Sequence, residues 1–126
     1  MKETALAFID RINAHDVEGL GALMSDDHTF VDAHGNQVTG KKQMMAGWQG
    51  YFAWFPDYRI EVTDVFEDGD KLALVGFAGG TFMNKEGESW RLPAALKAIV
   101  KDGRVTLWQV FADTKIPFEI IERNTP

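Results

Sequence analysis

Apolar side chains recur every three or four positions in the first half of the chain. This spacing predicts an amphipathic helix over about residues 3–13. Its apolar face comprises Ala5, Phe8, Ile9 and Ile12. Asp16 is placed to cap a second helix, because its side chain can accept a hydrogen bond from an early backbone N–H. That helix ends near Ser25, and a third helix begins after Gly40 and stops before Pro56, since proline disfavours helical backbone in the preceding residue.

The second half of the chain alternates between apolar and polar residues with a period of two. This alternation predicts antiparallel strands joined by glycine-containing turns. The four predicted strands are 58–67, 71–82, 90–101 and 104–112. A shorter pair, 28–32 and 37–39, precedes the third helix and turns at Gly35 and Asn36. Strand 71–82 is apolar on both faces, as expected for a central strand that is covered on both sides.

The order of elements is helix, helix, short strand pair, long helix and four meandering strands. It predicts an α+β fold in which three N-terminal helices pack on a curved, mainly antiparallel sheet. A sheet of this kind closes partway around the long helix and leaves a conical cavity. The length of 126 residues fits a single domain, 1–126, that buries most of its apolar surface.

Composition narrows the possible classes of function. The chain is 45% hydrophobic and 12% aromatic, which supports a packed core. Its net charge of −6 argues against binding nucleic acid, and no apolar run is long enough to span a bilayer. The start at Met1 lacks the charged-then-apolar order of a signal peptide, and the chain has no cysteine. We therefore expect a soluble cytoplasmic domain without disulfides or thiolate metal sites.

Asp32 is the strongest candidate for chemistry. It ends the apolar run 29–31 and precedes a turn, so it would lie at the inner end of a short strand beneath the helices. Burial in an apolar cavity would raise the pKa of its carboxyl group toward the range useful to a general base. The alternative is that Asp32 caps the turn by accepting hydrogen bonds from the backbone N–H groups of Gly35 or Asn36.

Two histidines accompany this carboxylate. His28, Asp32 and His34 share strand parity, so they could face the cavity together. A pair of His34 and Asp32 would support acid–base chemistry near neutral pH. Two imidazoles and a carboxylate could also bind a metal, but His34 falls in the turn, where parity breaks, and we expect no metal. The alternative places His34 in an exposed loop and His28 at a strand end.

Two polar residues stand near the end of the last strand. Asp113 could point into the cavity mouth, or it could end the strand and cap a following helix. Gln109 shares parity with an otherwise apolar row. An amide on such a face needs a partner, so it would hydrogen-bond either a ligand or a neighbouring backbone group.

Several aromatic residues could line a pocket for a flat apolar ligand. They are Trp48, Tyr51, Trp54, Trp90 and Trp108. At helical spacing such residues also form ordinary core, and Trp48 and Tyr51 fit that description. Trp54 lies off the main apolar stripe of its helix and is a candidate for a pocket or an interface.

The chain resembles the nuclear transport factor 2-like superfamily, and within it the SnoaL-like and ketosteroid-isomerase-like proteins. The segments that carry the resemblance are 12–16 (INAHD), 26–32 (DDHTFVD), 40–42 (GKK), 102–105 (DGRV) and 108–113 (WQVFAD). The resemblance implies a cone-shaped fold with Asp32 as the residue that moves a proton. In the isomerases a tyrosine and a protonated aspartate assist it, and their positions fall on Phe8 and near Leu96. Neither can donate a hydrogen bond, and losing one such donor typically lowers the rate about 100- to 1,000-fold, so ketosteroid isomerase activity is not expected.

Other relatives narrow the expectation further. Epoxide hydrolases of the superfamily need an acidic pair with an arginine, whereas the closing strand here offers Gln109 and Val110. The polyketide-cyclase relatives carry an acidic residue near the closing strand, and the resemblance implies that Asp113 is its counterpart in this chain. The resemblance also implies a homodimer formed through the outer face of the sheet.

These observations lead to two hypotheses. In the first, the chain binds a small apolar or polyketide-like molecule and catalyses its isomerisation, cyclisation or dehydration, with Asp32 as base and then acid. The second is a non-catalytic ligand-binding or dimeric interaction module of the same fold. No cofactor is expected. The candidate catalytic residues are Asp32, His34 and Asp113, and the candidate substrate-binding residues are Phe8, Tyr51, Trp54, Trp108 and Gln109.

Overall fold

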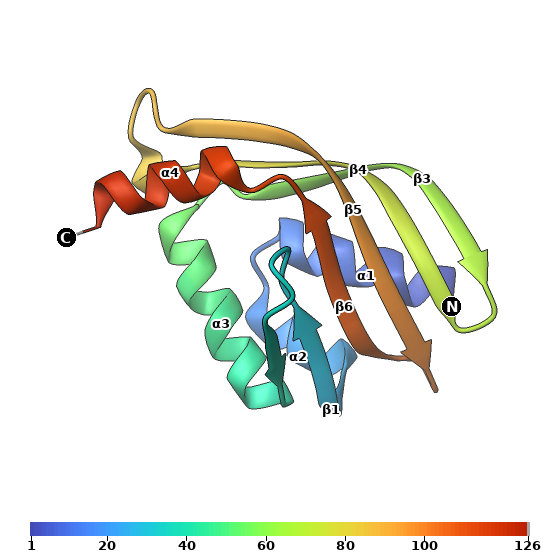
Figure 1. Cartoon of the computed structure of the whole chain (residues 1–126). Coiled ribbons are helices and arrows are strands. Elements are labelled where there is room, and N and C mark those ends of the chain that lie inside the picture. Colours follow the sequence, from blue (N-terminus) through green and yellow to red (C-terminus); the bar gives the residue numbers. More distant parts are fainter. Residues whose placement is uncertain (126) are drawn as a thin grey trace.

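Six strands form one curved sheet in the order β2-β1-β6-β5-β4-β3 (Figure 1). The structure, a computed structural model, describes residues 1–125. The strands are β1 (Met24–Val31), β2 (Gln37–Thr39), β3 (Arg59–Asp68), β4 (Lys71–Thr81), β5 (Ser89–Lys101) and β6 (Arg104–Ala112). The helices are α1 (Lys2–Asn13), α2 (Val17–Leu23), α3 (Lys41–Trp54) and α4 (Lys115–Asn124), with a 3-10 turn η1 (Phe82–Asn84).

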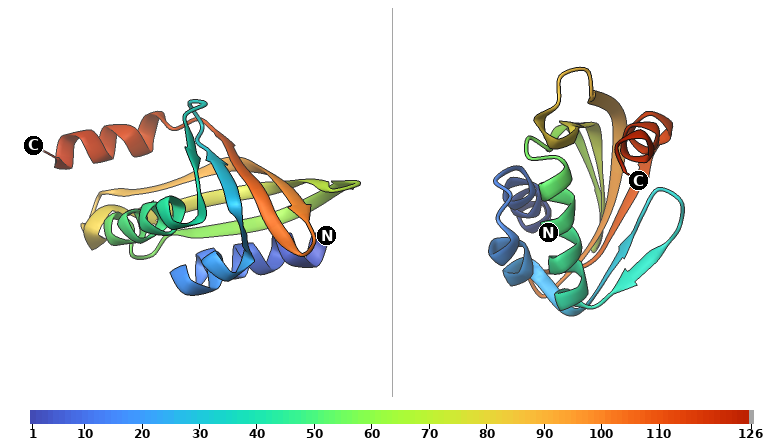
Figure 2. Two further views of the ribbon diagram at one scale, coloured as in Figure 1. Left: turned by 90° about the horizontal axis from the view of Figure 1, so that it is seen from below. Right: turned by 90° about the vertical axis from the view of Figure 1, so that its left-hand side faces the viewer.

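The sheet is antiparallel except where β1 and β6 run parallel. Helices α1, α2 and α3 gather on one side of it, which confirms the predicted α+β class (Figure 2). The strands β3 and β4 approach closely at Gly76, where an added Cβ would overlap the carbonyl oxygen of Glu61. The register shifts at the same place, between Val62 and Asp64, and irregularities of this kind bend a strand.

The core lies between the helices and the inner face of the sheet. Phe8 of α1 is fully buried, and its ring centroid lies 4.7 Å from that of Trp108 on β6. Trp48 and Phe52 of α3 pack into the same cluster. The core thus joins α1, α3 and the last strand, although these segments are far apart in the sequence.

Most predicted elements are present with small shifts in their ends. Asp16 caps α2 as predicted, because its Oδ1 accepts a hydrogen bond from the backbone N–H of Gly19 over 2.9 Å. Strand β1 starts at Met24 rather than at residue 28, since Met24 already pairs with Val105 of β6. The pairing of β5 with β6 begins at Ala94, one residue after Pro93. The missing N–H of Pro93 therefore removes no hydrogen bond between these two strands.

The helix α4 was not among the predicted elements. Pro117 stands in its first turn, where a proline is tolerated because the backbone N–H groups there have no helical partner. Pro117 and Ile120 are buried, and α4 begins directly after the end of β6. None of the helices in the described chain is long and apolar enough to cross a membrane.

Candidate functional site

A partly enclosed cavity of about 370 Å³ lies between the inner face of the sheet, α3 and α4. The turn that follows β1 closes one side of it. Its aromatic lining consists of Phe30, Trp48, Tyr51, Trp54, Tyr58, Trp90, Trp108 and Phe118. The sequence predicted a conical cavity beside the long helix, and the structure contains a cavity in that place.

The wall formed by α3 follows from helical spacing. Gln43, Gly47, Tyr51 and Trp54 recur three or four positions apart and therefore share one edge of the helix. Gly47 leaves room in this wall, because a Cβ there would meet only the side chain of Met44 at ordinary contact distance.

Alternation along β5 and β6 supplies the opposite wall. Ala94 and Leu96 on β5 and Trp108, Val110 and Ala112 on β6 all line the cavity, since every second residue of a strand faces the same side. The small alanine side chains leave space that larger residues would fill. The cavity is therefore a property of the local sequence on both strands.

The buried wall carries hydrogen-bond donors without partners. The indole N–H groups of Trp48, Trp90 and Trp108 are buried and have no acceptor within the described chain. Burial raises the pKa of the Tyr51 and Tyr58 hydroxyls, so both stay protonated, and neither makes a hydrogen bond within residues 1–125. Their rings meet edge to face with centroids 4.9 Å apart. Buried polar groups normally have partners, so these indole N–H groups are unusual in being unsatisfied within the described chain.

Asp32 lies at the mouth of the cavity and caps the turn. Its Oδ1 accepts hydrogen bonds from the backbone N–H groups of His34 (2.8 Å) and Asn36 (2.9 Å), and its Oδ2 accepts one from the Asn36 side chain (3.1 Å). Partial burial raises the pKa of this carboxyl group, but the three hydrogen bonds together outweigh that effect and hold the pKa below its ordinary value. The predicted upward shift of the pKa is wrong, because capping N–H groups stabilise the charged form.

His34 lies beside Asp32 and also lines the cavity. Its Nε2 is hydrogen-bonded to the Thr114 hydroxyl over 2.8 Å, and its ring meets Phe118 edge-on at 4.8 Å. The structure thus brings Asp32 and His34 together at the mouth, where α4 begins.

His28 is separate from this pair. It is fully buried, and its Nδ1–H donates to the carbonyl oxygen of Val105 over 2.7 Å. Burial lowers the pKa of its imidazole, with the hydrogen bond to Val105 acting in the opposite direction. His28 does not line the cavity, so the three residues do not face it together, the possibility that shared parity had left open; His28 lies within β1. Within residues 1–125, no three side chains of His, Asp or Glu are grouped so that they could hold a metal ion.

Three other predicted site residues lie away from the cavity. Asp113 is exposed and ends the strand, as the alternative prediction held; its Oδ1 accepts a hydrogen bond from the backbone N–H of Lys115, although the N-cap of α4 is Thr114. Gln109 faces the outer side of the sheet, because its neighbours Trp108 and Val110 line the cavity. Phe8 does not line the cavity either but packs against Trp108 in the core.

Of the predicted substrate-binding residues, the structure places Tyr51, Trp54 and Trp108 in the cavity wall. Sequence reasoning missed Tyr58 and Phe118. Tyr58 lies two residues before the buried Ile60, so alternation indicates that its side chain points toward the core. Alternation does not indicate that a cavity lies there. Phe118 belongs to α4, whose absence from the predicted elements concealed it.

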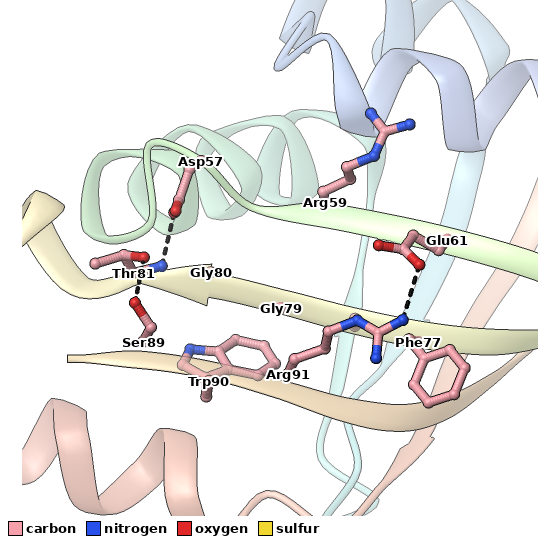
Figure 3. Close-up of a pocket in the computed structure, with 11 residues that line it drawn as sticks. Asp57, Arg59, Glu61, Phe77, Gly79, Gly80, Thr81, Ser89, Trp90 and Arg91 are labelled. Atoms are coloured by element: carbon pink, nitrogen blue, oxygen red, sulfur yellow. Dashed lines mark hydrogen bonds and ion pairs between the residues drawn. The ribbon is translucent and has the colours of Figure 1, made fainter. Parts of the chain in front are cut away.

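A second, smaller pocket of about 190 Å³ opens over β3, β4 and β5 (Figure 3). Several of its polar groups bind one another: Asp57 accepts from the Thr81 backbone N–H (2.6 Å), and Arg91 donates to Glu61 (2.9 Å), whereas Arg59 lines the pocket without such a contact to a described residue (Figure 3). Arg91 also lies over the ring of Phe77, 4.1 Å from its centroid. Because these groups already have partners, the aromatic cavity with its free donors is the better candidate site.

Comparison with known proteins agrees with this architecture. No curated protein matches the chain. Among solved structures, a protein from Shewanella denitrificans OS-217 assigned provisionally as a SnoaL-like polyketide cyclase superposes with a TM-score of 0.82 at 16% identity, covering 98% of this chain and 97% of that one. A hypothetical protein of ketosteroid isomerase-like fold from Catenulispora acidiphila, solved with trimethylamine, gives 0.79 at 22% identity, covering 86% and 84%.

An LEH-like epoxide hydrolase from M. tuberculosis gives a TM-score of 0.80 at 16% identity, covering 96% of this chain and 88% of that one. Identities this low establish a shared fold, but they do not transfer the activities of those proteins to this chain. The family model for the SnoaL-like domain matches residues 5–108, which include α1 to α3 and nearly the whole sheet. The chain therefore belongs to the SnoaL-like domain family.

Proposed function

We propose that this chain binds a small, largely apolar molecule in the aromatic cavity. The observation that carries the proposal is a hollow of about 370 Å³ whose walls are aromatic and whose buried indole N–H groups lack partners. Its volume lies within the range of about 300–1,000 Å³ typical of small-molecule sites. Aromatic walls of this kind favour a flat ligand.

The hydrogen-bond donors in the cavity wall indicate which polar groups a ligand should carry. An indole N–H can only donate, and the Tyr58 hydroxyl stays protonated because burial raises its pKa. A ligand oxygen that accepts one of these hydrogen bonds would remove a buried unsatisfied group and so bind more tightly. Asp32 is ionised and lies at the mouth, which disfavours an anionic ligand at that end.

Binding can be tested with N-phenyl-1-naphthylamine, a flat, neutral dye whose fluorescence rises in apolar surroundings. Gly47→Leu places a side chain in the cavity wall, and Gly50→Leu is the matched control on the same helix with nothing within 4 Å of its Cβ. Both substitutions raise helix propensity by a similar amount. We expect Gly47→Leu to weaken dye binding about tenfold, through overpacking, and Gly50→Leu to leave it unchanged.

Equal binding to both variants would show that the dye occupies another surface and would refute this site. Displacement of the dye by candidate ligands then ranks the chemistry that the cavity prefers. A ligand with an acceptor oxygen should displace it better than the corresponding hydrocarbon.

A second candidate function is proton transfer on the bound molecule, as in isomerisation, cyclisation or dehydration. The observation that favours it is the presence of two ionisable side chains, Asp32 and His34, together at the cavity mouth. The lowered pKa of Asp32 makes it ionised but weakly basic near neutral pH. Tyr51 and Tyr58 offer hydroxyl donors that the positions of Phe8 and Leu96 lack.

Enolisation of 2-tetralone provides a direct assay, because its exchange of carbon-bound hydrogen for deuterium is read by NMR. Wild type should accelerate the exchange, and Asp32→Asn should abolish the acceleration while the dye still binds. If both forms bind the dye and neither speeds the exchange of this ketone or of related ketones, the protein is a binder without this chemistry.

We also propose that the chain forms a homodimer through the outer face of the sheet. Val75, Ala95 and Phe111 are register neighbours across β4, β5 and β6, and Val75 and Phe111 are exposed. Covering this row would remove apolar surface from water. Light scattering at micromolar concentration should give twice the chain mass, and a monomer would contradict the proposal.

A further inference from the structure

The helix α4 lies across one side of the cavity. Pro117, Phe118 and Ile121 line the hollow, and the helix follows directly from β6 (Figure 1). It lies outside residues 5–108, the part of the chain that matches the SnoaL-like family model. The family model therefore does not cover the wall of the cavity that α4 forms.

Polar side-chain contacts attach α4 to the rest of the chain at both ends. At its start, Thr114 is hydrogen-bonded to His34 over 2.8 Å. At its end, Arg123 donates hydrogen bonds to Glu88, which lies between η1 and β5: Nε bonds to Oε2 over 3.0 Å and to Oε1 over 3.3 Å, and Nη2 bonds to Oε2. In the same place Lys85 donates to the Asn124 side chain over 3.0 Å.

The apolar contacts that hold α4 are limited. Ile120 is buried in the core, but the neighbouring inward residues Pro117, Phe118 and Ile121 border the cavity. Phe118 keeps 48% of its surface exposed. A helix of this length is marginal in water by itself, so its position depends on these few contacts.

From these contacts, and resting on the proposed binding function, we propose that α4 is a movable lid over the ligand cavity and that the Arg123–Glu88 ion pair is its latch. The lid completes the wall when it is closed and admits or releases ligand when it opens. Glu88 and Arg123 do not line the cavity and so do not contact a ligand there, and the latch therefore sets the speed of entry and exit. It does not set the affinity.

Charge exchange tests the latch. Glu88→Arg and Arg123→Glu each replace the attraction with repulsion, and the double variant restores a pair of opposite sign. Both side chains lie at the surface of the chain or near it, so the fold should survive each change. Glu61→Arg is the matched control, because it breaks the exposed Arg91–Glu61 pair on β3 and β5, away from α4.

Two measurements are made on each variant. Hydrogen exchange of the α4 amides is followed without ligand, and association and dissociation rates of N-phenyl-1-naphthylamine are followed by stopped-flow fluorescence. Because an exposed ion pair contributes little, each single variant should raise both rates by roughly two- to fivefold with an unchanged Kd, and α4 exchange should accelerate similarly. The double variant should return all three quantities to the wild-type values, and Glu61→Arg should change none.

The outcomes separate the two proposals. If the wild type does not bind the dye, the binding function fails, and the lid has no ligand to admit. If the dye binds and the single variants leave its rates and α4 exchange unchanged, the latch is refuted while binding stands. A double variant that stays as fast as the single variants would also refute the latch, because the ion pair itself would then not be the cause.

Discussion

Lowering the pH from 7.5 to 5.5 should destabilise the folded chain through His28. The imidazole is fully buried beside Phe8, with ring centroids 5.9 Å apart, and its Nδ1–H donates to the Val105 carbonyl. Its Nε2 has no partner in the described chain, so a proton added there would be buried without an acceptor. Burial accordingly lowers the pKa of His28, against the smaller opposing effect of the hydrogen bond.

The sign and size of the effect follow from proton linkage. Because the folded pKa is lowered, the unfolded chain takes up the proton first, so stability is complete above the ordinary value near 6.5 and falls as the pH drops below it. A histidine that stays neutral in the fold over this whole range would reduce the free energy of unfolding by about 1.4 kcal/mol between pH 7.5 and 5.5. That is the upper limit for one group, and it corresponds to roughly 5 °C in Tm for a chain of this size.

Urea unfolding at pH 7.5, 6.5 and 5.5 measures this loss. His28→Phe should start from a lower stability, because the Val105 carbonyl loses a donor, and should then show a flatter pH dependence. His34→Phe is the control, since that imidazole is exposed at the cavity mouth, and it should keep the wild-type slope. If wild type is equally stable at pH 7.5 and 5.5, or if His28→Phe keeps the full slope, the reasoning about the buried imidazole is wrong.

Three further predictions concern the fold and can be checked by thermal or urea unfolding. Phe8→Ala should reduce stability by about 3–5 kcal/mol, because it empties a fully buried site against Trp108, and a loss below 1 kcal/mol would mean that the core collapses to fill the space. Gly76→Ala should lower Tm, since its Cβ would overlap the Glu61 carbonyl oxygen, and an unchanged Tm would show that β3 can move away. Asp16→Ala should lose about 1 kcal/mol with the cap of α2, whereas Asp16→Asn should retain most of it.

The elements that the sequence predicted well are those whose side chains follow a clear period. The helical spacing around Phe8 reflects burial of one face, and the structure contains α1 there. Residues 71–81 form β4 within the predicted range 71–82, but only alternate residues are buried, so the strand is covered on one face and not, as expected, on both. The helix α4 was missed although Ile120 and Ile121 are apolar, because Pro117 and its short length obscure the period. The early start of β1 was missed because Asp26 and Asp27 are polar in an exposed stretch of strand.

The candidate site was predictable in place but not in detail. Tyr51 and Trp108 were candidates because they are large aromatic residues, and both line the cavity. Parity could not tell the inner face of β6 from the outer one, so Gln109 was assigned inward. The pKa of Asp32 depends on three hydrogen bonds formed by the turn geometry, and the identity of the residue alone does not specify them.

The parallel pairing of β1 with β6 has a consequence for synthesis of the protein. Met24 pairs with Val105, and Phe8 rests on Trp108, so α1 and β1 leave the ribosome long before the strand β6 on which they pack. Until β6 is released, β1 has an unpaired edge and α1 an uncovered apolar face, and these are surfaces through which nascent chains associate. Folding of this domain therefore completes only once β6 has been synthesised, and loss of β6 removes the strand against which Phe8 and β1 pack.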